Sequence, residues 1–152
     1  MSFQWQTSDF QGLGNTQLYA ALKLRQEVFA VEQASIYVDA DGLDLNAIHM
    51  LYWEQGELMA YQRCLPPGLQ ETESTLGRIV VAPAARGRNL GRDLVRRGLA
   101  QNFERWPQAD IRIHAQAHLE AYYCGLGFAT QGEVYDLDGI PHLEMLCSKT
   151  PA

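Results

Sequence analysis

The chain has 152 residues and a formal net charge of −6, and hydrophobic residues make up an ordinary 47% of its composition. This length suits one domain with a single core, so we expect one domain over residues 1–152. No apolar run approaches the ~20 residues of a membrane helix, and the first residues lack the features of a signal peptide. Three widely spaced cysteines without a C-x-x-C pair indicate free thiols in a reducing cytoplasm.

The first third of the chain predicts a strand, a helix and a loop. Residues 3–6 are strand-like, and Thr16 is the predicted N-cap of an amphipathic helix that ends near residue 31. Residues 35–46 contain several aspartates and predict a loop. These aspartates do not match a calcium loop, because Leu43 and Asp44 stand where an oxygen ligand and a glycine are required. We interpret the cluster as a turn cap, with attraction of a cationic amine as a second interpretation.

The remaining pattern predicts an α/β domain. Residues 47–53 and 58–64 form a predicted hairpin, and residues 76–82 form a buried strand that Pro83 ends. Apolar residues recur at helical spacing from Asn89 to Trp106. The next elements are a strand over residues 111–115, a short helix over 119–126 that ends at Gly127, and paired strands over 133–137 and 143–147. Strand, helix and strand over 76–115 form a parallel βαβ unit within a mixed sheet flanked by helices.

Positive charge is concentrated in one segment. Residues 77–105 hold seven of the twelve basic residues and only two acidic ones, for a net charge of +5, while the rest of the chain carries −11. Such a distribution favours one compact polyanion and disfavours a long nucleic acid, which the acidic remainder would repel.

The loop between the buried strand and the long helix predicts an anion site. A helix N-terminus offers free backbone N–H groups and positive potential, and Gly87 and Gly91 allow close approach of the backbone. Arg86, Arg88 and Arg92 can add charge-assisted hydrogen bonds to phosphate. The loop has neither G-x-x-x-x-G-K-[ST] nor G-x-G-x-x-G, which argues against a nucleoside triphosphate loop and a dinucleotide fold.

Two linked motifs carry a resemblance to a known family. Residues 79–83, followed by Arg86-Gly87-Arg88-Asn89-Leu90-Gly91, resemble motif A of the GCN5-related N-acetyltransferases (GNAT), and residues 123–128 resemble the family's Y-x-x-x-G-F signature. Further segments at residues 28–33, 39–44, 115–119 and 138–142 resemble the ElaA-type subfamily of bacterial acetyltransferases, so the resemblance covers nearly the whole chain.

This resemblance implies a GNAT fold and acetyl-CoA as co-substrate, with no metal. It implies that the pantetheine lies between two diverging parallel strands and that the pyrophosphate lies on the loop. The implied cofactor-binding residues are Ile79, Val80, Val81, Arg86, Gly87, Arg88, Asn89, Leu90, Gly91, Arg92 and Gln116. Asn89 stands where the family often has glycine, and Gln116 where many members have asparagine.

The catalytic groups are less well defined. The match to Y-x-x-x-G-F makes Tyr123 the candidate proton donor to the departing thiolate, and we assign the neighbouring Tyr122 to the core. The family often places a glutamate base on the strand over residues 76–82, but this chain has no carboxylate there. Glu32, near the end of the first helix, is the candidate base. His118 and His142 are weaker candidates, and deprotonation through ordered water is another route.

The leading hypothesis is an acetyl-CoA-dependent N-acetyltransferase that acts on a small-molecule or peptide amine. A non-catalytic acyl-CoA-binding domain is the runner-up, and an acyltransferase for a longer acyl chain shares the fold. We expect neither nucleic acid nor membrane as a partner, and the resemblance allows a homodimer. His114 and His118 flank a strand end and do not form a zinc motif.

Overall fold

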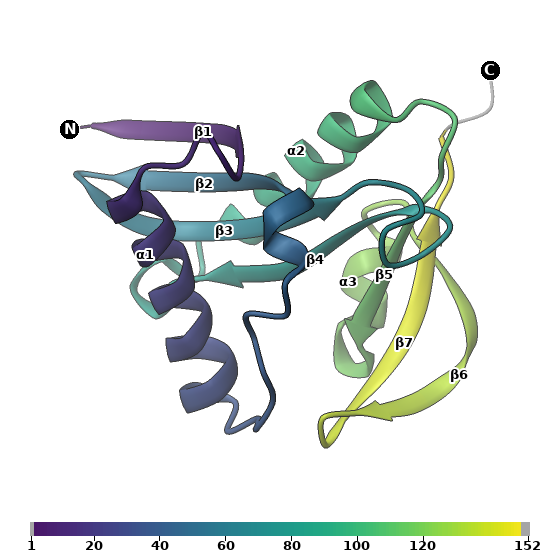
Figure 1. Cartoon of the computed structure of the whole chain (residues 1–152). Coiled ribbons are helices and arrows are strands. Elements are labelled where there is room, and N and C mark those ends of the chain that lie inside the picture. The colour runs from purple at the N-terminus through teal and green to yellow at the C-terminus, as the bar shows by residue number, and fades with distance from the viewer. Residues whose placement is uncertain (1, 150–152) are drawn as a thin grey trace.

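The computed structural model describes residues 2–149 and contains one seven-stranded sheet in the order β1-β2-β3-β4-β5-β7-β6 (Figure 1). Neighbouring strands are antiparallel except β4 and β5, which run parallel because α2 crosses over between them. The strands are β1 (Phe3–Asp9), β2 (Ile48–Glu54), β3 (Glu57–Leu65), β4 (Ser74–Val81), β5 (Ile111–Gln116), β6 (Ala129–Leu137) and β7 (Ile140–Cys147). The predicted α/β fold with a mixed sheet, one parallel βαβ unit and flanking helices is confirmed.

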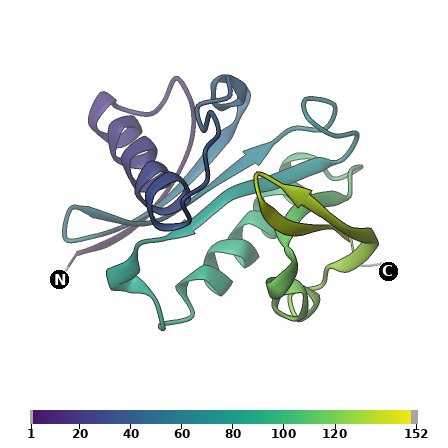
Figure 2. The same cartoon turned by 90° about the horizontal axis from the view of Figure 1, so that it is seen from below.

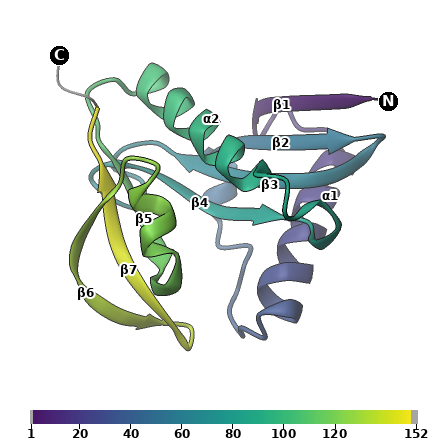
Figure 3. The same cartoon turned by 180° about the vertical axis from the view of Figure 1, so that it is seen from behind.

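Helices cover both faces of the sheet. Helix α1 packs on one face of β3 and β4, while α2 packs on the other face, and α3 lies on the side of α2 (Figures 2 and 3). The helical segments are α1 (Asn15–Arg25), the π-helical η1 (Gln26–Glu32), the 3-10 turns η2 (Leu43–Asn46), η3 (Pro83–Ala85) and η4 (Ala117–Leu119), α2 (Leu90–Arg105) and α3 (Glu120–Cys124). None of the helices within residues 2–149 is long and apolar enough to cross a membrane.

Two cores hold these layers together. On the α1 face, Leu24 packs with Leu51 and Val80 of the sheet. On the other face, the larger core joins Val95 of α2 to Ile113 and to residues of β7 and α3. Burial of these apolar side chains is the main favourable term in folding, at roughly 25 cal/mol per Å² of apolar surface.

The first helix differs from its prediction at both ends. Its N-cap is Gly14 and not Thr16, because the Gln17 side-chain oxygen accepts the Gly14 backbone N–H at 2.9 Å. The predicted continuation to residue 31 is present, but from Gln26 onward the backbone widens to π-helical turns. The hairpin turns lie where turn residues predicted them, with positive φ at Asp138 and Gly139 in the last one.

A buried ionic network fixes the aspartate-rich loop. The Arg25 guanidinium, 1% exposed, donates to Asp39 and Asp44 at 2.8 Å each. Arg63 of β3 donates to Asp44, and also to Asp41 at 2.8 Å. The interpretation of these aspartates as an amine-attracting cluster is wrong, because guanidinium groups already occupy their carboxylates. Only Asp41 also caps a turn, where it accepts the Leu43 N–H.

We predict that Asp44→Ala lowers the free energy of unfolding by about 3 kcal/mol, because it removes the carboxylate that two buried guanidinium groups share and leaves Arg25 with Asp39 and Arg63 with Asp41 alone. Urea denaturation measures this loss. Glu27→Ala is the matched control, since Glu27 forms an exposed ion pair with Lys23 that contributes no more than about 0.5 kcal/mol. Equal losses for the two variants would contradict a structural role for the network.

The same network makes the free energy of unfolding fall at acid pH. Burial opposes ionisation of Asp44, but Arg25 and Arg63 outweigh that effect and lower the pKa of its carboxyl group. The contribution of Asp44 to stability is therefore complete above the ordinary aspartate pKa and is lost as pH falls below it.

Candidate functional site

The sheet opens between its two parallel strands. Strands β4 and β5 pair only at Ser74 with Ile111 and at Thr75 with Arg112, and beyond these pairs they diverge. On its other side, β4 remains paired with β3 up to Val81. The edge of β4 that faces β5 therefore has backbone N–H and C=O groups without a strand partner from residue 76 to residue 81. Unpaired backbone groups at such an edge are ready to bind an extended ligand.

A bulge in β4 lies beside this opening. Tyr61 pairs with Val80 and Arg63 with Gly77, so β4 has one more residue than β3 between these pairs. Arg78 takes a left-handed conformation, with φ +49°, and forms an ion pair with Asp39 at 2.7 Å. A bulge changes which face the following side chains occupy. The bulge lies in the part of β4 that has already separated from β5.

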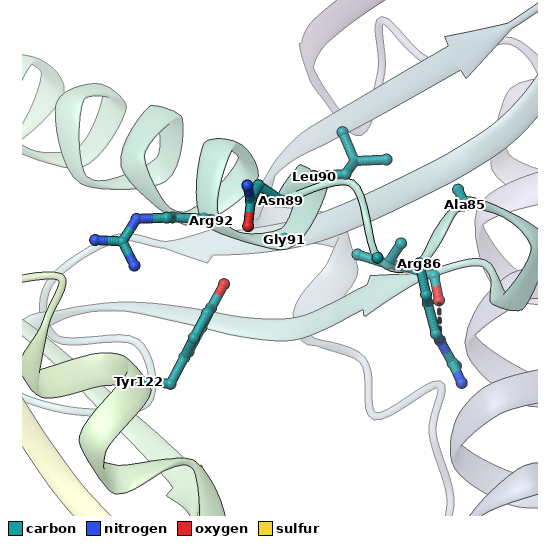
Figure 4. A pocket seen from close by; sticks show the side chains of 9 residues that line it. Ala85, Arg86, Asn89, Leu90, Gly91, Arg92 and Tyr122 are labelled. Atoms are coloured by element: carbon teal, nitrogen blue, oxygen red, sulfur yellow. Dashed lines mark hydrogen bonds between the residues drawn. The ribbon is translucent and has the colours of Figure 1, made fainter.

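A cavity of about 300 Å³ lies near the open end of the split, where β4 leads into α2 (Figure 4). Its wall comes from the end of β4, the following loop, the first turn of α2, and one residue of α3. The lining residues are Val81, Ala85, Arg86, Gly87, Asn89, Leu90, Gly91, Arg92 and Tyr122. Seven of the predicted cofactor-binding residues, all but Ile79, Val80, Arg88 and Gln116, thus surround one space.

The backbone of this loop is shaped for close approach. Gly87 and Asn89 have φ of +81° and +58°, and Asn89 is the residue before the first turn of α2. Asparagine is among the few non-glycine residues that adopt this conformation readily. The first backbone N–H groups of the 16-residue α2 have no partner within the helix, and the helix dipole adds positive potential there. The cavity is therefore suited to an anion.

Two of the predicted phosphate ligands already hold carboxylates. Arg86 donates to both oxygens of Glu32, at 2.6 and 2.7 Å, and Arg88 donates to both oxygens of Glu54, at 3.0 and 3.1 Å. Arg92 forms no ion pair within residues 2–149, and Figure 4 shows its guanidinium on the far side of the cavity from Arg86. The loop from Arg86 to Arg92, called the cradle below, thus contains two arginines that a carboxylate already holds and one, Arg92, that can bind a ligand without breaking an ion pair.

The predicted base Glu32 is the partner of Arg86. It lies at the end of η1, exposed, and hydrogen bonds from Arg86 lower the pKa of its carboxyl group. The next residue, Gln33, accepts a hydrogen bond from Gln116 of β5 at 3.2 Å. The end of η1 therefore contacts both the loop after β4 and the end of β5. Of the weaker candidates, His118 is exposed, and His142 is held by the Ile140 carbonyl oxygen at 2.7 Å.

The two tyrosines of α3 have different surroundings. Tyr122 lines the cavity, where its hydroxyl lies only 3.3 Å from the point that a Cβ on Gly91 would occupy. Tyr123 is 7% exposed and packs edge-on against Phe128 in the main core. Tyr122 also packs against the main core, so its assignment to the core is confirmed, and its contact with the cavity was not predicted. Two adjacent aromatic residues on a helix of five residues point to different sides, and periodicity alone does not decide which side is which.

The comparisons with known proteins agree with this geometry. The chain matches the family model described as "Acetyltransferase (GNAT) domain" over residues 15–149. It is 40% identical to protein ElaA of Escherichia coli over 144 residues, which cover 93% of this chain and 94% of ElaA. The crystal structure of E. coli ElaA superposes with a TM-score of 0.91 at 38% identity, covering 97% of this chain and all of that one. An acyl-CoA N-acyltransferase from Pseudomonas aeruginosa superposes with a TM-score of 0.92 at 42% identity and the same coverage.

We predict that two glycines of the loop have different reasons to be glycine. Gly87→Ala lowers the free energy of unfolding by about 1 kcal/mol or more, because a side chain at φ +81° is strained although nothing lies within 4 Å of its Cβ. Gly91→Ala leaves stability within about 0.5 kcal/mol of the wild type, because alanine's helix propensity offsets crowding against Tyr122. Urea denaturation of both variants checks this, and a larger loss for Gly91→Ala would contradict it.

Proposed function

Because the chain belongs to the GNAT acetyltransferase family and is therefore an acyltransferase, we propose that it moves an acetyl group from acetyl-CoA to a small-molecule or peptide amine. The observation that supports this most directly is the split between β4 and β5, whose open end meets the cavity at the start of α2. Coenzyme A has a diphosphate joined to a narrow pantetheine chain. The diphosphate suits the loop before α2, and the pantetheine suits the split between β4 and β5.

The residues present suit each part of coenzyme A. The pyrophosphate would lie on the first turn of α2 and the loop before it, with Arg92 free to donate to it. The pantetheine would run along the open edge of β4, with Ile79, Val80 and Val81 contributing backbone groups and Gln116 reaching it from the end of β5. Gly91 matters because any side chain there would narrow the passage beside Tyr122 and Val81.

Arg86 and Arg88 contribute by exchanging partners. Each now holds a partly exposed carboxylate, and exposed ion pairs contribute only about 0–1 kcal/mol. Turning to a diphosphate therefore costs little and yields charge-assisted hydrogen bonds to a stronger anion. The exchange also frees Glu32, and only then can its oxygens take part in acceptor binding or deprotonation.

The chemistry needs the amine nitrogen to attack the thioester carbonyl carbon and the CoA thiolate to leave with a proton. Backbone N–H groups on the open edge of β4 can stabilise the negative charge that develops on the carbonyl oxygen. Holding both substrates in one split supplies much of the rate, up to ~7–11 kcal/mol in ideal cases.

We assign the proton donor to Tyr123. Tyr122 lies at the phosphate end of the cavity, beside Gly91, whereas the thioester would lie deeper in the split. Tyr123 packs in the core that contains Leu76 and Ile113, which lie on the two strands where they begin to diverge. The Tyr123 hydroxyl is protonated before the thiolate forms, and burial, which raises its pKa above the ordinary value, makes it a weaker acid than a solvated tyrosine.

We predict that arginine and tyrosine substitutions separate binding from turnover. Arg86→Ala, Arg88→Ala and Arg92→Ala each weaken acetyl-CoA binding by about tenfold or more, because each removes a charge-assisted hydrogen bond to phosphate. Tyr123→Phe lowers kcat with little change in affinity. Calorimetric titration and CoA-release kinetics measure these effects, with Arg105→Ala, at the distant end of α2, as the control. If Tyr123→Phe lost as much affinity for acetyl-CoA as the three arginine variants, the assignment of arginine to binding and tyrosine to turnover would be overturned.

We predict that Glu32→Gln tightens acetyl-CoA binding by up to about fivefold, because Arg86 no longer has to leave a carboxylate. The same variant keeps most of its kcat if Glu32 is not the base. Titration and steady-state rates with one amine acceptor measure both effects. Unchanged affinity together with a large loss of kcat would instead show that Glu32 is the base and not a competitor of phosphate.

A further inference from the structure

A second group of polar side chains lies on the face of the sheet opposite the cavity. Along β5, Ile111, Ile113 and Ala115 belong to the core beneath α2 and α3, so the alternate residues occupy the other face. Among these, His114 lies directly across from Glu144 of β7. This face borders the split from the side that coenzyme A does not occupy in the proposed complex.

Three side chains form a hydrogen-bonded chain there. The Tyr135 hydroxyl lies 2.5 Å from Nδ1 of His114, and Nε2 of His114 lies 2.8 Å from Oε1 of Glu71. A carboxylate only accepts hydrogen bonds, so Nε2 carries the imidazole proton and Nδ1 accepts from the hydroxyl. Burial, with Glu144 and Glu71 nearby, raises the pKa of Tyr135, which keeps its hydroxyl protonated. Hydroxyl, imidazole and carboxylate in this order are arranged to move a proton.

Gly77 of β4 lies across the split from His114. Continuing the register of the two β4–β5 pairs places Gly77 level with His114, and alternation from the core residue Leu76 places it on the same face. Gly77 has no positive φ that would require glycine, and a Cβ there would meet no atom within 4 Å. A glycine inside a strand without such a backbone requirement suits the close approach of a ligand.

The charge of this face favours a cation. Arg112 donates to Glu73 and Glu144, whereas Glu71 is bonded to His114, so three carboxylates lie here with one guanidinium and negative charge is in excess. A primary amine is a cation at neutral pH and must lose a proton before it can attack a thioester. The same face thus offers attraction for the ammonium form and a path for its proton.

We propose that Tyr135, His114 and Glu71 form a relay that deprotonates a cationic primary amine, the acceptor class of this enzyme. This inference rests on the proposed function. An N–H bond of the ammonium breaks and its proton passes to the Tyr135 oxygen. The hydroxyl proton of Tyr135 passes to Nδ1 of His114, and Glu71 holds the resulting imidazolium. The neutral amine keeps its electron pair for attack on the carbonyl carbon, and His114 later returns its proton to solvent.

A divalent cation is the competing occupant. Glu71, His114 and Glu144 bring possible ligand atoms within 4.8 Å of one another. However, Arg112 donates to Glu144 at 3.3 Å, and Tyr135 already bonds to Nδ1 of His114. A metal would have to displace a guanidinium and a hydroxyl, so the geometry favours proton transfer.

The test compares two isomeric acceptors at saturating acetyl-CoA. Benzylamine is protonated at neutral pH, whereas 4-methylaniline is neutral there and needs no base. We expect His114→Gln and Tyr135→Phe to lower kcat/KM for benzylamine by about 10²-fold. For 4-methylaniline, kcat/KM should stay within about twofold of the wild-type value. Raising the pH should recover the lost rate for benzylamine, because more of it becomes neutral. Arg105→Ala, at the distant end of α2, is the control and should behave as wild type.

The pH profile must be interpreted with all nearby groups in view. These are Glu71 and Glu73 from the loop before β4, Arg112 from β5, Tyr135 from β6, and His142 and Glu144 from β7. His142 also lies beside Tyr135, and the His142→Gln variant tests whether it takes the proton in place of His114. A loss for benzylamine in His142→Gln but not in His114→Gln would overturn the assignment.

Other outcomes are equally decisive. Equal losses for both acceptors, or no loss, would reject the relay. Loss of wild-type activity in EDTA and its return with zinc chloride would show a metal site instead.

Each variant must keep the wild-type affinity for acetyl-CoA, which shows that it is folded. If the wild type binds acetyl-CoA but acetylates only 4-methylaniline, the relay fails and the proposed function stands. If it binds no acetyl-CoA, the proposed function itself fails.

Discussion

The limited pairing of β4 with β5 is the constraint on which the rest of the structure depends. After two paired positions the strands separate, and the sheet becomes two halves, β1–β4 and β5–β7–β6, that share one short seam. Backbone groups left unpaired at such an edge must be solvated or bound by a ligand. The network of Arg25, Arg63 and Arg78 with the aspartates of residues 39–44 ties β4 to β3 and α1, which keeps β4 with its own half. The split therefore lies between two separately paired halves of the sheet.

The two faces of this split differ in charge and in shape. On the α2 side, a loop with left-handed residues and a helix N-terminus form a cradle for an anion. On the other side lie Glu71, His114 and Glu144, where we propose that the cationic amine binds. Substrates of opposite charge can therefore approach from opposite faces without competing. The basic segment is also less free than its composition indicates, since Glu32 and Glu54 already neutralise Arg86 and Arg88.

Local signals in the sequence were sufficient for the fold and for most of the cradle. The β-branched strand, the turn at Gly87 and the amphipathic helix from Asn89 follow one another closely, so short-range patterns place Val81 and Gly91 around one cavity. Contacts between distant segments could not be predicted in this way. The pairing of Arg86 with Glu32 joins residues 54 positions apart, and the chain from Glu71 through His114 to Tyr135 joins three separate elements. Sequence periodicity contains no information on such partners.

The helix α3 shows a second limit. A signature that ends in glycine and phenylalanine identified the helix, but the choice between Tyr122 and Tyr123 depends on how a helix of five residues rotates against its neighbours. That rotation is set by packing of Tyr123 against Phe128 and by the absence of a side chain at Gly91. Both are tertiary effects.

The central claim is that coenzyme A occupies the split along β4. Hydrogen–deuterium exchange with and without acetyl-CoA tests it directly. The account predicts slower exchange for the backbone amides of residues 79–81 and 87–92 when acetyl-CoA is bound, with the amides of β1 and β2 unchanged. Protection of the 87–92 segment alone, with no change at residues 79–81, would mean that only the phosphates bind and would contradict the claim.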